Sequence, residues 1–220
     1  MDSITEALII SFYSHKLHVE DTCNLQYPSD GMIGLCEDIF SCLLNVKCEE
    51  IVRVIQKIGP VFEISHGDVP QFSSLEDCVY KVPLLVKDCG IDELCYTQLG
   101  FMLRTKPRKE GADMKYGENQ SKTAAQMGLC SIKNARIYPS CLGVSYCNLD
   151  KESQMDLLPK LIIFIPYIYN QFASNAKYED IITSVSFLSQ STQKRRLTNI
   201  WSLISQVNKV LPYELQIVRY

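Results

Sequence analysis

The sequence predicts a mainly α-helical protein with small β wings, in which an N-terminal helical part precedes tandem winged helix-turn-helix units. Apolar residues recur at helical spacing along most of the chain, as in helices that pack one face on a core. Residues 101–129 hold the densest positive charge and end in a short helix before Gly128. Short strand-like segments follow that helix. We therefore divide the 220 residues into an N-terminal region over 1–70, a winged helix-turn-helix over 71–150 and a second helical or helix-turn-helix unit over 151–220.

The N-terminal region is predicted to be helical, and the sequence assigns no role to it. Apolar spacing predicts helices over residues 3–16, 35–44 and 51–58, and a Gly-Pro pair stops the last of them. Residues 61–64 are predicted as a short strand. The loop that follows favours a domain boundary near residue 70.

The middle of the chain begins with residues 75–86, which have helical spacing but contain Pro83. Because proline lacks a backbone N–H and clashes with the preceding turn, this helix should be kinked or divided into two pieces. The next helix is predicted from Ile91 to about Arg104. A charged loop of roughly ten residues then leads to Lys115.

A second helix of this unit is predicted over residues 118–127, with Gly128 as its C-cap. Residues 129–132 and 136–138 then predict two short strands. The resulting succession of helix, loop, helix and two-stranded wing is the order of a winged helix-turn-helix.

The C-terminal part is predicted to repeat this theme. A long helical region covers residues 151–172, with breaks expected at its two prolines, and another helix covers 178–188. The last helix is expected to begin after an N-cap at Thr192 and to run to about Val207. Residues 213–220 alternate in polarity and predict a closing strand.

Charge is distributed unevenly along the chain. The net charge is −3, which alone argues against a nucleic-acid partner. Residues 104–136, however, contain eight basic and three acidic residues, a net charge of +5, and residues 192–200 carry +3. The rest of the chain therefore carries −11. Such a polarised molecule repels a phosphate backbone except where the two basic segments meet it.

The two basic segments supply the candidate DNA contacts. Lysine and arginine are expected to meet phosphates, whereas polar side chains near the start of a recognition helix are expected to reach base edges. A basic group at a helix N-terminus also lies where the helix dipole favours phosphate. A solvated loop that binds nothing is the alternative interpretation. The residues predicted to bind DNA are Lys106, Arg108, Lys109, Lys115, Asn119, Gln120, Lys122, Thr123, Lys133, Arg136, Thr192, Lys194, Arg195 and Arg196.

Two segments, KEGADMKYGENQSKTAAQMGL at 109–129 and SQSTQKRRLTNIWSLISQV at 189–207, resemble a winged-helix module found with bacterial restriction endonucleases and phage-defence proteins. The first has a tyrosine-containing helix and a Met-Gly-Leu stop. The second has a Ser-Thr turn, paired arginines and a helix that carries Trp201. The resemblance extends over roughly residues 75–208. It implies a DNA-recognition part whose cutting chemistry comes from a nuclease domain or partner, although this chain shows no recognisable nuclease segment.

No catalytic residue, cofactor or metal site is predicted. The ten cysteines form no CxxC pair, and at least five residues separate any two of them, which is too far for a usual zinc site. Most are expected to be reduced, buried thiols. His15 and His18 are three residues apart, a spacing that metals use on a helix, but they lack a second ligand cluster. A cryptic metal-dependent nuclease would have to use Glu63, Asp68 and Lys81.

No segment reaches the roughly 18 uninterrupted apolar residues of a membrane-spanning helix, and the N-terminus lacks the basic start of a signal peptide. The expected location is therefore cytoplasmic, without membrane contact. The predicted function is non-catalytic binding of double-stranded DNA in bacterial defence or transcriptional regulation. An alternative is a protein-interaction subunit of a defence complex, whose winged helices dock a partner such as a nuclease. A second alternative is the cryptic nuclease.

Overall fold

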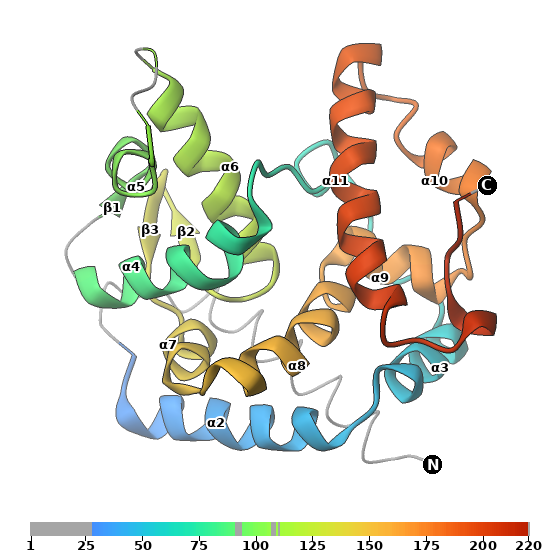
Figure 1. The fold of residues 1–220 in the computed structure, drawn as a ribbon, viewed down its shortest axis with the longest axis horizontal. Helices are drawn as coiled ribbons and strands as arrows, with labels where there is room; N and C mark the ends of the chain where they lie inside the picture. Colours follow the sequence, from blue (N-terminus) through green and yellow to red (C-terminus); the bar gives the residue numbers. More distant parts are fainter. Residues whose placement is uncertain (1–27, 91–93, 107–108, 110, 220) are drawn as a thin grey trace. The chain divides into compact units, whose positions relative to one another are not determined.

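The computed structural model describes residues 28–90, 94–106, 109 and 111–219, and the elements keep the labels of Figure 1. The predicted helix over 3–16 and the side chain of Arg108 lie outside these residues. The protein is mainly helical, as the sequence predicts, and contains a small three-stranded antiparallel sheet where the sequence predicts a two-stranded wing. The described chain forms two compact units. Residues 28–41 and 72–154 make the sheet unit, and residues 42–71 and 155–219 make the helical unit.

The sheet unit begins with most of α2 (Asp30–Asn45), which covers the helix predicted over 35–44. The region around Pro83 consists of a π-helical turn, η1 (Asp77–Lys81), followed by α4 (Val82–Cys89). The backbone N–H of Val82 reaches back to the carbonyl of Asp77, one residue further than in an α-helix. This local change accommodates the proline near the start of α4, so the predicted break is confirmed.

The sheet of this unit joins three short strands in the order β1-β3-β2. They are β1 (Leu94–Cys95), β2 (Ser131–Lys133) and β3 (Arg136–Tyr138). The strands β2 and β3 form the predicted hairpin, whereas β1 occupies residues that were predicted as helix. Asn134 and Ala135 turn the hairpin with φ angles of 51° and 59°. Two consecutive left-handed residues are the turn that matches the twist of paired strands.

Two helices lie between β1 and β2, namely α5 (Tyr96–Met102) and α6 (Ala112–Gln126), and Figure 1 shows them side by side next to the sheet. The helix α6 stops where the sequence predicts, because Gly128 adopts a φ of 80° and the N–H of Leu129 bonds back to the carbonyl of Ala124. The hairpin is followed by α7 (Cys141–Asn148), a helix that the sequence pattern does not predict. The hydroxyl of Ser140 caps α7 by accepting the N–H of Gly143 at 2.9 Å.

The helical unit contains α3 (Cys48–Ile58), most of α8 (Lys151–Ile163), α9 (Pro166–Ala173), α10 (Tyr178–Ser184) and α11 (Gln190–Asn208). Its core is the apolar run over 161–165 and the inner face of α9, all of it buried. Of the two breaks predicted over 151–172, the one at Pro166 is confirmed, since α9 starts there. Pro159 instead lies within α8 without ending it.

Two predicted strands in the helical unit are wrong. Residues 61–64 are irregular, and Asn170 of α9 bonds their backbone: its side chain accepts from the N–H groups of Val61 and Phe62 and donates to the carbonyl of Phe62 at 2.7 Å. Residues 213–215 form the 3₁₀ turn η2 (Tyr213–Leu215), and no strand follows among the described residues. A second β wing is therefore not part of residues 151–219.

Candidate nucleic-acid interface

The helix α6 is held by an unusually close contact with α5. A Cβ added to Gly100 would lie 1.8 Å from the carbonyl oxygen of Asp113, and one added to Gly117 would lie 2.0 Å from that of Tyr96. The backbones of the two helices therefore touch at two points, a turn apart on each helix. This contact fixes which face of α6 is turned inward.

The outward face of α6 carries Lys115, Glu118, Asn119 and Lys122 at helical spacing. The carboxylate of Glu118 pairs with both lysines, at 2.8 Å from the Nζ of Lys115 and 2.7 Å from the Nζ of Lys122. These two hydrogen bonds lower the pKa of Glu118. The two lysines that the sequence predicts as phosphate contacts are thus brought together, but an acidic residue outside the predicted set lies between them. The i+3 and i+4 spacing is the sequence signal for this ion pair.

Gln120 and Thr123, predicted as base contacts, face the interior instead. Gln120 is fully buried, and its amide accepts the N–H of Ser73 at 2.9 Å and donates to the carbonyl of Ser74 at 2.8 Å. Thr123 is 1% exposed. The Gln120 side chain holds α6 in the unit, and neither Gln120 nor Thr123 reaches the surface where a base edge would lie. The structure therefore places these two residues on the inner face of α6 rather than on the surface that the sequence predicts.

The remaining candidates of the sheet unit lie before α6 and on the hairpin. Lys106 and Lys109 are exposed, and they come from the segment that joins α5 to α6. On the hairpin, Lys133 is exposed and Arg136 is half-buried, opposite each other in the β2–β3 register. The segment between α5 and α6 and the β2–β3 hairpin therefore add basic side chains to those that α6 carries.

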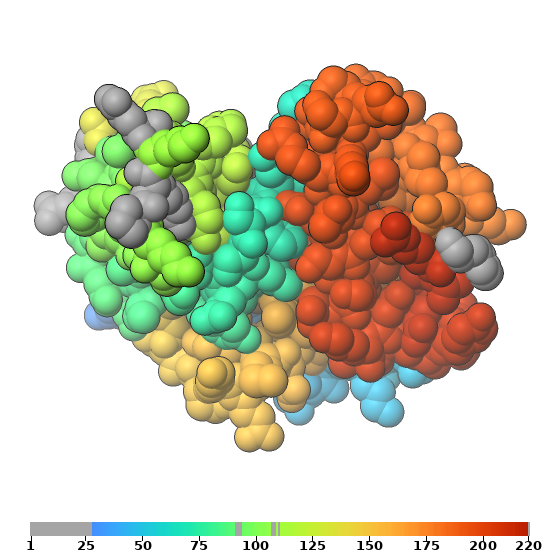
Figure 2. All heavy atoms as spheres, turned by 45° about the horizontal axis from the view of Figure 1, so that its top comes forward, coloured from blue at the N-terminus to red at the C-terminus, as the bar shows by residue number. Residues whose placement is uncertain are grey.

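The candidates of the helical unit lie in the first two turns of α11, whose orange-red surface is seen in Figure 2. Lys194 and Arg195 are exposed, and Thr192 is half-buried within the helix, where it accepts the hydroxyl of Ser189 at 2.9 Å. The N-cap is Ser189 rather than Thr192.

Arg196 is not part of that exposed surface. It is 8% exposed, and its guanidinium donates a hydrogen bond to the carbonyl of Val69. Burial, reinforced by the neighbouring Arg195, lowers the pKa of Arg196. Arg196 lies on the face of α11 that also buries Ile200, so helical periodicity turns it away from solvent. The structure therefore gives Arg196 a bond inside the helical unit rather than the exposed position that the sequence predicts.

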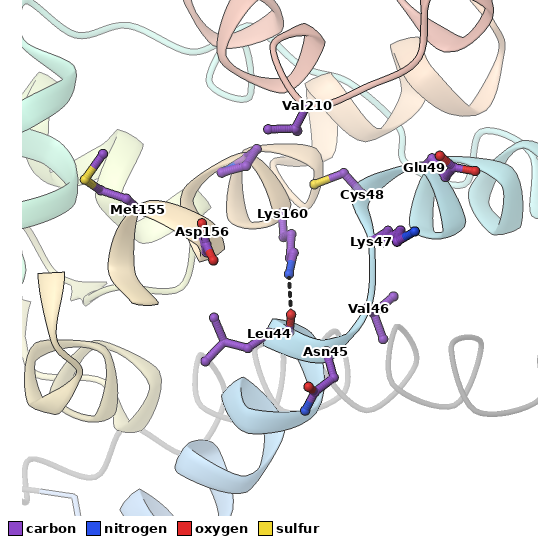
Figure 3. Close-up of a pocket in the computed structure, with 11 residues that line it drawn as sticks. Leu44, Asn45, Val46, Lys47, Cys48, Glu49, Met155, Asp156, Lys160 and Val210 are labelled. Carbon is purple, nitrogen blue, oxygen red and sulfur yellow. Dashed lines mark hydrogen bonds between the residues drawn. The ribbon is translucent and has the colours of Figure 1, made fainter. Parts of the chain in front are cut away.

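A hollow in the helical unit surrounds Lys160 of α8 (Figure 3). Its volume is about 270 Å³, just below the range of about 300–1,000 Å³ for small-molecule sites. The Nζ of Lys160 donates to the carbonyls of Leu43 and Leu44 at 2.6 and 3.2 Å, at the C-terminal end of α2. Burial lowers the pKa of Lys160. We interpret the amine as a cap for α2, whose own last turn contains no basic residue.

Two of the three residues named for a nuclease, Asp68 and Lys81, are bonded to residues nearby in the chain. The carboxylate of Asp68 accepts the N–H of Ser65 at 2.7 Å and its hydroxyl at 2.5 Å. Lys81 pairs with the buried Asp77 at 2.7 Å. Within residues 28–90, 94–106, 109 and 111–219, no group of three or more His, Cys, Asp or Glu is placed to hold a metal ion. His15 and His18 lie outside the described residues.

Comparisons with protein-family models, with characterised proteins and with solved structures found no match to this chain. Among the described helices, none is long and apolar enough to cross a membrane.

Proposed function

We propose that the sheet unit is a winged helix-turn-helix module that binds double-stranded DNA without catalysis. The observation that carries this proposal is the succession α4–β1–α5–α6–β2–β3 with the strand order β1-β3-β2, in which the helix before the hairpin turns lysines to solvent. A helix followed by a basic hairpin can place its outer face in the major groove while the hairpin meets the adjacent backbone. The proposed setting is bacterial defence or transcriptional regulation.

The proposed contacts are fewer than the sequence suggests, because only side chains that reach solvent are retained. In the sheet unit, Asn119 is the proposed base contact, and the lysines of α6, of the loop and of the hairpin are the proposed phosphate contacts. The first turns of α11, with Lys194 and Arg195, form a second proposed contact. Lys115 and Lys122 must exchange the carboxylate of Glu118 for phosphate when DNA binds.

The test is a titration of a labelled duplex with the full chain at increasing salt, followed by fluorescence anisotropy. We expect affinity to fall steeply with salt, because each lysine that neutralises a phosphate releases counterions. Lys122→Ala should weaken binding to all sequences and reduce the slope of log K against log salt by about 1. Lys57→Ala, which removes an exposed lysine from α3 of the helical unit, is the matched control. Absent binding at low salt, or equal effects of the two variants, would contradict the proposal.

A second candidate function, docking of a partner protein, is favoured by a specific feature of α5 and α6. Phe101, Met102 and Met114 are 58%, 44% and 50% exposed, although all three are large and apolar. The guanidinium of Arg104 lies 4.1 Å from the centre of the Phe101 ring and pairs with Asp113 at 3.7 Å. Apolar surface of this kind contributes little to a phosphate contact. Duplex binding that is unaffected by Phe101→Ser, together with loss of a partner captured by the wild type, would separate the two functions.

A further inference from the structure

The hollow around Lys160 combines a buried cation with exposed apolar side chains. Its lining comes from the end of α2, the start of α3, α8 and the segment after α11, all within the helical unit. Lys160 is 6% exposed, whereas Met155 and Val210 are 58% and 53% exposed although both are large and apolar. Figure 3 shows the Lys160 amine reaching from α8 toward Leu44 inside the hollow.

The Lys160 amine is bonded to neutral groups. It donates to the carbonyls of Leu43 and Leu44, and no carboxylate among the described residues forms an ion pair with it. Asp156 lines the same hollow but is exposed, and burial lowers the pKa of Lys160 in spite of that nearby negative charge. A charge taken out of water is costly unless an opposite charge compensates it. Because an ammonium has three N–H donors, one is left for an acceptor in the hollow.

Apolar side chains border the amine on several sides. Met155 and Pro159 are four residues apart and therefore share a face of α8. Val210 comes from the segment after α11, and Leu44 comes from the end of α2. Apolar surface beside a few placed polar groups is the usual composition of a small-molecule site. The lining therefore matches a molecule that has an anionic end and an apolar body.

We propose that this hollow binds a small monocarboxylate with a short apolar tail. The carboxylate accepts the remaining N–H of Lys160 and supplies the opposite charge that the amine lacks, while the tail lies along Met155, Pro159 and Val210. An amine with the same tail would bring two cations together, and a neutral alcohol would leave the buried charge uncompensated. The volume of about 270 Å³ restricts the ligand to a small one.

The site is separate from the proposed DNA contacts. Its residues belong neither to the sheet unit nor to the first turns of α11, which carry Lys194 and Arg195. The ligand uses the N–H of Lys160 that the end of α2 does not use, so the bonds to Leu43 and Leu44 are kept when it binds. Binding of the carboxylate therefore does not depend on the proposed function.

The experiment titrates the full chain, isotopically labelled at its methionine methyl groups, with hexanoate, hexylamine and hexanol in separate NMR series at neutral pH. Met155 reports on the hollow, and Met114 of the sheet unit, which is 50% exposed, is the internal control. We expect hexanoate to shift the Met155 signal saturably and to leave Met114 unchanged. The other two compounds and the Lys160→Met variant should bind about 10- to 100-fold more weakly, the range for loss of a hydrogen bond between charged groups.

Val210→Glu tests the position of the site, because it brings a negative charge to the opening from an exposed residue. It should abolish the hexanoate shift of Met155. Val61→Glu is the matched control, since Val61 is a 57% exposed valine of the same unit that does not line the hollow. It should bind hexanoate as the wild type does.

Three results would overturn the proposal: no saturable shift of Met155 with hexanoate, equal affinities for hexanoate, hexylamine and hexanol, or equal effects of Val210→Glu and Val61→Glu. The comparison of the three compounds is made on the wild type. A folding defect in Lys160→Met therefore does not change its meaning.

Discussion

The carbonyl oxygen of Tyr96 occupies the space that a side chain on Gly117 would need, since a Cβ there would lie 2.0 Å from it. Gly117→Ala should therefore force α5 and α6 apart. Overpacking of this kind costs about 1–3 kcal/mol, which exceeds the ~1 kcal/mol that alanine gains over glycine within a helix. Urea unfolding followed by circular dichroism measures the change. Gly34→Ala on α2 is the control, because that site is open, and it should be neutral or stabilising. Equal stabilities of the two variants would be incompatible with the close contact.

Glu118 should restrain the two lysines beside it. Removing its charge in Glu118→Gln frees Lys115 and Lys122 for phosphate, so duplex affinity at low salt should rise by about two- to fivefold, the range that corresponds to breaking exposed ion pairs worth ~0.5–1 kcal/mol. The matched control is Glu152→Gln, which removes an exposed carboxylate from the start of α8. Anisotropy titrations of both variants at several salt concentrations provide the measurement. A gain that is the same for both would point to net charge rather than to this ion pair.

Lys160 should make the stability of the protein depend on pH. Because burial lowers the pKa of this amine, the unfolded chain binds more protons than the folded one between the lowered pKa and the ordinary value near 10.5. The free energy of unfolding should therefore rise with pH in that window and be lowest below it. Lys160→Met removes this pH dependence. The difference between wild type and variant, measured by urea unfolding from pH 7 to 10, should shift in favour of the wild type as pH increases. A difference that is flat with pH would contradict the buried amine.

Substitutions of Arg195 and Arg196, which are adjacent on α11, should have different effects on stability and on duplex binding. Arg196→Ala removes the donor to the Val69 carbonyl and should lower the free energy of unfolding by about 1–3 kcal/mol. Arg195→Ala changes an exposed side chain and should stay within about 0.5 kcal/mol of the wild type, while weakening duplex binding. Thermal unfolding and anisotropy on the same samples distinguish the two effects. If Arg196→Ala alone weakened binding without a loss of stability, the structural role given to it would be wrong.

The sequence predicts best the elements that are determined by the local pattern of residues. The apolar spacing of α3 and the short strand β3 are set by local pattern, and the stop of α6 is set by Gly128. The helix α7 was not predicted because it contains Gly143, and glycine is more typical of turns than of helix interiors. Its actual role is close packing, since a Cβ there would lie 2.0 Å from the carbonyl of Leu129.

The predicted strands are absent where side chains, rather than a neighbouring strand, form the hydrogen bonds to the backbone. Over 213–220, the alternating pattern is real, but Asn208 donates to the carbonyl of Ile217 at 2.8 Å and accepts its N–H at 3.3 Å. The amide of Gln216 donates to the carbonyl of Leu211 at 2.8 Å. Amide side chains therefore bond backbone groups that a neighbouring strand would otherwise have to meet, and periodicity contains no sign of that.

For a related reason, the sequence predicts only in part which candidate residues are exposed. The exposed lysines of α6 follow from their charge, but α6 has few large apolar residues, so its inward face could not be identified from a hydrophobic stripe. That face is built from small and amide residues, including Gly117 and Gln120. The burial of Arg196 likewise could not be predicted from the sequence, because a long charged side chain is usually exposed.

The division of the sheet unit between two stretches of chain has a practical meaning for expression clones. A fragment beginning at residue 72 would keep α6 and the hairpin but would omit residues 28–41, and with them the partners that α2 offers to Ser145 and Tyr146. Such a fragment should be poorly soluble and should expose the apolar side of α7. A deletion variant that retains residues 28–41 and 72–154, joined by a flexible linker in place of the intervening segment, is the smaller protein worth making.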